Sequence, residues 1–375
     1  MTIPSHPQTP SLSRRRFLQA SATAASGLVL SGCGWTLAEV RPTTLSRGNK
    51  DEIYIYTWES YVDSQLIETF KTQTGIQVTP SLFSSNEEML AAFQAGKSAN
   101  FSVIYPSDYT VGEMIEKRLL SKLDHSRISG LENLMPQFQD SAYDRNNEHS
   151  IPISWGTTGL IYNSEALNPA PDDWEYLWQN QQKLMRKMTL LDDKREVMGV
   201  TLKTLGYSYN STNLQEIQHA YEKLVTLKPA VTTFTTSAWI DRLLAGDLLL
   251  AMVYSADAVR VINENPDRKF KYVIPKSGSS LWSDTMVIPK SSPNPDAAYA
   301  WINFMLQPAI AADITQRLFF ATPNQAAYDQ LPTPLRNDRS LFPSEDVINA
   351  CERIIPLRPE ILELYDQYWT KLTSG

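Results

Sequence analysis

The stretch that begins at residue 53 alternates apolar and aromatic positions and predicts a β-strand that leads into a binding edge. Isoleucines alternate with tyrosines in residues 53–56, and from Asp63 onward the apolar residues recur at helical spacing. In open α/β sheets, ligands bind just beyond the carboxyl ends of strands. Trp58, Glu59 and Tyr61 are therefore candidate binding residues, because two rings there flank a carboxylate. The alternative is that both rings simply pack on the following helix.

The same succession of strand and helix continues along the chain and predicts an α/β fold. Further strands are expected at residues 76–79, 101–105, 151–163, 188–191, 248–254, 271–275 and 285–288. Further helices are expected at residues 86–93 with Asn86 as cap, 174–178, 193–205, 214–227, 239–245 and 295–306, from Asn324, and in the tail from Pro343. The long stretch 151–163 is broken by glycines and suits a chain that crosses between two lobes. We place the first hinge there.

Acids recur beside rings or hydroxyl groups at five predicted strand ends. The groups are Trp58 with Glu59; Ser107, Asp108 and Tyr109; Asp193 with Glu196; Tyr254 with Asp257; and Trp282 with Asp284. Together they predict a cleft lined with rings and carboxylates. Such a cleft fits a flexible polyamine, whose methylene groups lie between rings and whose ammonium groups meet carboxylates.

Asp193 and Glu196 have two possible roles. They lie three residues apart in the first turn of a predicted helix, so both carboxylates face the same way and can hold one ammonium group. The alternative is a capping box, in which Asp193 caps the helix and Glu196 reaches back to the backbone N–H of the cap residue.

Composition and charge narrow the possible functions. The chain has 375 residues, 42% hydrophobic and 20% charged, which suits a soluble protein with two lobes of ordinary size. Its net charge of -7 argues against a nucleic-acid partner. No cofactor or metal site is expected, since the chain has neither a zinc-type histidine pair nor a complete phosphate loop. Paired carboxylates also occur in glycosidases, but here the acids are spread over both halves of the chain.

The N-terminus has the features of an export signal. Residues 14–16 are arginines that precede a short apolar stretch, as in twin-arginine signals. That stretch ends in Leu30-Ser31-Gly32-Cys33, which looks like a lipobox and predicts lipidation of Cys33. We therefore expect a signal at residues 1–32, a tether at 33–49, and a periplasmic domain that a lipid anchors to a membrane. A plain signal peptide with a chance cysteine is the alternative.

A set of short motifs runs through the mature chain: Tyr56-Thr57-Trp58, Tyr61-Val62, Thr74-Gly75-Ile76, Ser85-Asn86-Glu87, Pro106-Ser107, Ile151-Pro152, Trp155-Gly156, Asp192-Asp193, Arg195-Glu196-Val197, Leu205-Gly206-Tyr207, Trp282 with Asp284, Ile288-Pro289 and Thr322-Pro323-Asn324. In these motifs the chain resembles the bacterial spermidine/putrescine-binding proteins, the extracytoplasmic receptors of polyamine ABC transporters. It departs from the family in the order Glu59-Ser60, in Tyr254 where a tryptophan is usual, and in Phe320 where a tyrosine is usual.

The resemblance implies a two-lobed periplasmic binding protein fold of type II with the ligand cleft between the lobes. One lobe would comprise residues 50–155 and 260–317, and the other residues 156–259 and 318–375. The implied ligand contacts are rings at Trp58, Tyr61, Tyr109, Tyr254 and Trp282, and carboxylates at Asp193, Glu196, Asp257 and Asp284. The implied function is that of a non-enzymatic, monomeric receptor that delivers spermidine or putrescine to ABC permease subunits. Alternatives are a receptor of the same fold for another small cation or a metal ion, and a tethered periplasmic hydrolase.

Overall fold

The structure is a computed structural model that describes residues 50–374. The predicted signal, the tether and Cys33 lie outside the described residues. The strands are β1 (Glu52–Trp58), β2 (Gln77–Phe83), β3 (Val103–Ile104), β4 (Ser150–Asn163), β5 (Met188–Leu190), β6 (Val231–Phe234), β7 (Leu250–Tyr254), β8 (Phe270–Val273) and β9 (Leu281–Val287). The helices are α2 (Ser64–Thr74), α3 (Asn86–Gln94), α4 (Asp108–Glu116), α5 (Tyr176–Gln179), α6 (Lys194–Thr204), α7 (Leu214–Leu227), α8 (Trp239–Ala245), α9 (Ser255–Glu264), α10 (Pro295–Met305), α11 (Pro308–Leu318), α12 (Gln325–Gln330), α13 (Thr333–Arg336), α14 (Glu345–Ala350) and α15 (Pro359–Thr373).

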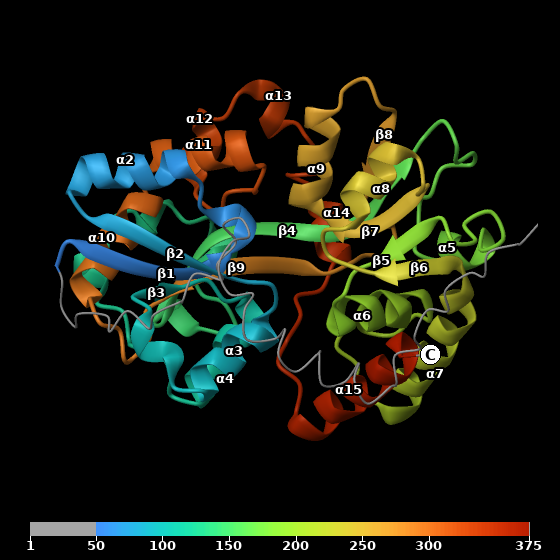
Figure 1. Ribbon diagram of the computed structural model, residues 1–375, viewed down its shortest axis with the longest axis horizontal. Helices are drawn as coiled ribbons and strands as arrows, with labels where there is room; N and C mark the ends of the chain where they lie inside the picture. Colours follow the sequence, from blue (N-terminus) through green and yellow to red (C-terminus); the bar gives the residue numbers. More distant parts are fainter. Residues whose placement is uncertain (1–49, 375) are drawn as a thin grey trace, which may run out of the picture. The chain divides into compact units, whose positions relative to one another are not determined.

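Within the described residues the strands form one mixed sheet that divides into two groups (Figure 1). Its order is β2-β1-β3-β9-β4-β7-β5-β6, and β8 also pairs with β4. Residues 150–157 of β4 pair with β9, whereas residues 158–163 pair with β7 and β8. We call the part built on β1, β2 and β3 the first lobe, and the part built on β5 to β8 the second lobe. The predicted boundary at 259/260 separates β8 from its partner strand, so we propose that the second lobe extends through β8.

The first lobe has apolar side chains on both faces of β1. Ile53 and Ile55 are fully buried and pack in one cluster with α2 and α10. Tyr56, next to them in sequence, packs on the opposite face in a cluster with α3 and α4. Because successive side chains of a strand point to opposite faces, the alternation seen in the sequence corresponds to helices on both sides of the sheet. Packing on both faces of β1 thus fixes the position of the turn that follows Trp58.

The second lobe explains why residues 248–254 are almost continuously apolar. Leu250 and Met252 of β7 pack in the cluster that contains α6, α7 and α15. Ala251 and Val253 pack in a separate cluster with α8 and α9. Both faces of β7 are buried, and β7 runs parallel to β5, as the unbroken apolar pattern predicts.

Several local predictions were wrong, and three of them concern α3, β4 and the tail. Asn86 does not cap α3: the side chain of Ser85 accepts the hydrogen bond from the backbone N–H of Glu88, which leaves Asn86 free for other contacts. The glycines do not break β4, which runs unbroken. A Cβ atom at Gly156 would lie 2.3 Å from Cζ2 of Trp282, so this glycine permits close packing. Finally, the tail is not continuously helical, because Glu352 pairs in extended conformation with the chain at Ser280.

Candidate functional site

The predicted strand-end residues lie where neighbouring strands stop and helices begin. Trp58 is the last residue of β1, Ser107 is the N-cap of α4, and Asp193 is the N-cap of α6. Tyr254 is the last residue of β7. Only β9 differs from the prediction, since it begins at Leu281, so that Trp282 and Asp284 lie within the strand and not in a turn before it.

Asp284 is the centre of a buried hydrogen-bond group that joins four elements. Its Oδ2 accepts a hydrogen bond of 2.6 Å from the hydroxyl of Tyr61, and its Oδ1 accepts one of 2.7 Å from the hydroxyl of Ser107. The Tyr61 hydroxyl also lies within hydrogen-bond distance of the Ser154 hydroxyl. Asp284 is only 8% exposed and forms no ion pair with lysine or arginine among the described residues. This carboxylate is therefore held by neutral donors alone.

Asn86 extends this group, and the sequence did not predict its role. Its Nδ2 donates hydrogen bonds to the hydroxyls of Tyr109, at 2.9 Å, and of Ser107, at 3.1 Å. Its Oδ1 accepts a hydrogen bond from the backbone N–H of Ser107. Asn86 is 5% exposed. It thus fixes the positions of two predicted site residues relative to Asp284.

Asp193 and Glu196 form the second acidic group, and only Asp193 acts as a cap. Its Oδ1 accepts hydrogen bonds from the backbone N–H groups of Arg195 and Glu196, and its Oδ2 accepts one from the hydroxyl of Tyr254 at 3.3 Å. Glu196 does not complete a capping box. Its carboxylate accepts hydrogen bonds from the hydroxyls of Tyr209 and Ser280. The hydrogen-bonding role of Glu196 is therefore tertiary and not part of the helix start.

Burial makes these carboxyl groups easier to protonate. Burial raises the pKa of Asp284 to about 6, although the hydrogen bonds from Tyr61 and Ser107 oppose the shift. The pKa of Glu196 is raised to about 8, first by burial and then by the neighbouring charge of Asp193. Asp193 itself has a raised pKa because of burial and the charge of Glu87. A cation entering the site would favour the ionised form of each group.

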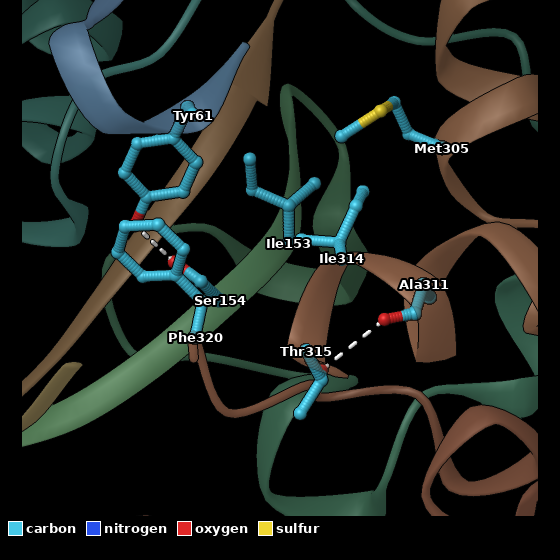
Figure 2. A pocket seen from close by; sticks show the side chains of 8 residues that line it. All are labelled: Tyr61, Ile153, Ser154, Met305, Ala311, Ile314, Thr315 and Phe320. Carbon is cyan, nitrogen blue, oxygen red and sulfur yellow. Dashed lines mark hydrogen bonds between the residues drawn. The ribbon is translucent and has the colours of Figure 1, made fainter. Parts of the chain in front are cut away.

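The predicted rings lie beside these acids. The rings of Tyr254 and Trp282 meet edge to face with centroids 5.7 Å apart, and the ring of Tyr61 stacks on Phe320 at 4.1 Å. Figure 2 shows the Tyr61 and Phe320 rings at the wall of a small, mainly apolar pocket. Its volume of about 10 Å³ holds roughly one water molecule. This pocket is therefore packing space behind Tyr61 and is too small for a polyamine.

Two predicted site residues of the described chain form no hydrogen bond with these groups, although the charge of Asp257 contributes to the raised pKa of Tyr61. Glu59 is exposed in the short turn that follows β1. Asp257 on α9 forms an ion pair of 3.2 Å with Arg260, one helical turn further on. Burial raises the pKa of Asp257, and the Arg260 guanidinium opposes that shift. Asp257 therefore already has a cationic partner within the protein, unlike Asp284.

Neither a metal site nor a membrane span is found in the described part of the chain. Between residues 50 and 374, no group of three or more histidine, cysteine, aspartate or glutamate side chains is arranged to hold a metal ion. Within the same residues, no helix combines the length and apolar character needed to cross a bilayer.

Known proteins resemble this chain in both sequence and fold. A family model described as bacterial extracellular solute-binding protein matches residues 65–341. The chain belongs to this family. The family resemblance and the two-lobed α/β solute-binding fold predicted from the sequence are both confirmed.

Several relatives of this solute-binding protein have names that state a ligand or a lipid anchor. The spermidine/putrescine-binding periplasmic protein of Salmonella typhimurium is 33% identical over 328 residues, which cover 87% of this chain and 93% of the relative. The structure of a putative spermidine/putrescine ABC transporter from Listeria monocytogenes is 37% identical in sequence, with a TM-score of 0.81, and the match covers 86% of this chain and 98% of that chain. A lipoprotein of Treponema pallidum is 27% identical, with a TM-score of 0.78, and covers 87% of this chain and 100% of its own.

Proposed function

We propose that this solute-binding protein is a polyamine receptor that captures spermidine or putrescine between its lobes and delivers it to an ABC permease. The proposal rests on three carboxylates that have no lysine or arginine partner in the described part of the chain. Asp193, Glu196 and Asp284 accept hydrogen bonds from hydroxyl or backbone N–H groups, and none forms an ion pair with lysine or arginine among residues 50–374. Buried charges are normally paired, so these acids suit a ligand that brings its own cations.

Two neighbouring acids differ from these three, because each already pairs with an arginine. Asp108 is 1% exposed and pairs with Arg353 at 3.0 Å, and Asp257 pairs with Arg260. We therefore assign the ammonium contacts to Asp193, Glu196 and Asp284, and give Asp257 a supporting role. The rings of Tyr61, Tyr254 and Trp282, among those predicted, would face the methylene groups of the ligand.

Closure of the lobes is consistent with the packing of two tyrosines. Tyr109 lies in the first turn of α4 in the first lobe, yet its ring packs against the apolar cluster of the second lobe. Tyr254 packs against clusters of both lobes. A ligand held between these residues would contact both lobes at once. Binding would then stabilise the closed arrangement, which is the form that a permease would receive.

Calorimetric titration of the purified protein with putrescine, spermidine and spermine tests the proposal. We expect saturable binding of at least one of them, a higher melting temperature in its presence, and recovery of the ligand chemically unchanged. Absence of both heat and thermal stabilisation with all three would overturn the polyamine assignment. Conversion of the ligand to a product would instead show the hydrolase that we do not propose.

We further propose that the receptor is exported, carries a lipid on Cys33 and acts as a monomer in the periplasm. The support is the twin-arginine and lipobox pattern, together with the likeness to the Treponema pallidum lipoprotein. Cys33→Ser is expected to move the exported protein from the membrane fraction to the soluble fraction, since a lipid chain supplies membrane affinity through its buried methylene groups. Equal amounts of both proteins in the membrane fraction would contradict lipidation of Cys33.

A further inference from the structure

Lys194 places an ammonium group of the protein itself beside the proposed site. It is the first residue of α6, directly after Asp193. Its Nζ lies 3.5 Å from Oε1 of Glu87 and also contacts the carboxylate of Asp366. Glu87 belongs to α3 in the first lobe, whereas Lys194 and Asp366 belong to α6 and α15 of the second lobe (Figure 1). The ion pair with Glu87 therefore joins the two lobes.

The acids near Lys194 differ in exposure, and we call Glu196, Asp193 and Glu87, in order of increasing exposure, the row of acids. Glu196 is 2% exposed, Asp193 is half-buried, and the side chain of Glu87 is 59% exposed. Glu87 is close enough to Asp193 and Tyr109 for its charge to raise the pKa of each. A ligand longer than a diamine that fills the interior end would extend along this row towards Glu87. The outermost acid would be the natural contact for a third ammonium group.

Resting on the polyamine function proposed above, we propose that Lys194 is a specificity-determining residue that disfavours longer polyamines relative to a diamine. Its ammonium group already neutralises Glu87 and would repel a third ligand ammonium arriving there. The ion pair alone contributes little to holding the lobes together, because Glu87 is largely exposed. Lys194 is different, since its side chain is only 12% exposed and Asp366 holds its charge in place. The main effect of Lys194 is thus to place a positive charge beside Glu87, where the end of a longer ligand would lie.

The test compares putrescine, which has two ammonium groups, with spermidine, which has three, by calorimetry on the full-length protein. For Lys194→Met we expect spermidine to bind more tightly relative to putrescine. The ratio of the Kd of putrescine to the Kd of spermidine should rise about two- to fivefold, which is the effect of a single partly exposed charge pair. Glu87→Gln removes one of the two carboxylates that pair with the Lys194 ammonium group, and it is expected to shift the ratio the opposite way. The double variant should return the ratio close to that of the wild type.

Lys223→Met is the matched control. Lys223 is a partly buried lysine of the second lobe that pairs with Glu175 at 2.8 Å, on α7 and away from the row of acids. Its removal changes the net charge equally and should leave the ratio unchanged. The inference would be overturned if Lys194→Met changed the affinities for putrescine and spermidine by the same factor. It would also be overturned if Lys194→Met changed the ratio no more than Lys223→Met does. Either result would leave the polyamine function intact. A wild-type protein that binds neither ligand would overturn the proposed function, and this inference with it.

Discussion

Asp284→Asn is expected to weaken polyamine binding by a factor of about 30 or more while leaving the melting temperature of the ligand-free protein unchanged or higher. Removing one partner of a desolvated charge pair costs roughly 2 to 5 kcal/mol, and about 1.4 kcal/mol corresponds to a tenfold change in affinity. An asparagine still offers an oxygen to Tyr61 or Ser107, which donate to Asp284 in the wild type. The variant therefore tests the charge and largely keeps the shape.

The expected stability follows from the pKa of Asp284. Burial raises it to about 6 in the folded protein, from 3.8 as an ordinary aspartate. A group with a raised folded pKa favours folding most when it is protonated, so its contribution is lost as pH rises from about 4 to about 6. At pH 7 the charge of Asp284 opposes folding, and the neutral amide removes that opposition.

Asp296→Asn serves as the control for this experiment. Asp296 is 82% exposed and pairs with Arg127 on the surface of the first lobe, so its charge should affect neither binding nor stability appreciably. Affinity and melting temperature are measured on the same preparations. If the Asp284→Asn protein bound polyamines as tightly as the control, Asp284 would not be a ligand contact.

Secondary structure could be predicted where the pattern is local and strong. The helix expected at residues 214–227 matches α7 residue for residue, because its apolar positions follow one helical face and Asn213 supplies the cap. The end of α2 has an equally local signal, since Gly75 adopts a left-handed conformation with φ of 75°. Both signals depend only on residues within a few positions of one another.

The failures share a dependence on distant residues. Asn86 and Ser85 are both good capping residues, and the choice between them depends on Ser107 and Tyr109, which form hydrogen bonds with the Asn86 side chain from about twenty residues away. The extended segment at Glu352 depends on pairing with Ser280. Nothing within either segment encodes these partners.

The candidate site shows the same division between local and distant signals. Acids and rings beside strand ends were recognisable in the sequence, because binding residues of α/β folds lie there. The donors that hold those acids were not, since Tyr209 and Ser280 reach Glu196 from other elements. One partner could be recognised: Arg260 follows Asp257 at helical spacing, and that pattern already indicates an ion pair within a helix.

Glu196→Gln is expected to lower polyamine affinity and to abolish most of the proton release that accompanies binding near pH 7. The pKa of Glu196 is raised to about 8, so in the ligand-free protein this carboxyl is largely protonated at pH 7. A bound ammonium group favours the carboxylate, and the proton must then leave. The ammonium groups of putrescine are primary, with a pKa of about 10 like that of lysine, so they stay charged throughout and do not contribute.

The measurement is calorimetry at pH 7 in two buffers with different ionisation enthalpies, repeated at pH 6 and 8. For the wild type we expect release approaching about one proton per ligand, and affinity that rises with pH by up to about tenfold per unit until the pKa of Glu196 is reached. Glu196→Gln should show a flatter pH profile, whereas Glu113→Gln, which alters an exposed ion pair with Lys117, should behave as the wild type. Identical proton release in wild type and Glu196→Gln would mean that Glu196 stays protonated in the complex. The ammonium group would then be held by Asp193 with Tyr254, because these two side chains are already joined by a hydrogen bond without Glu196.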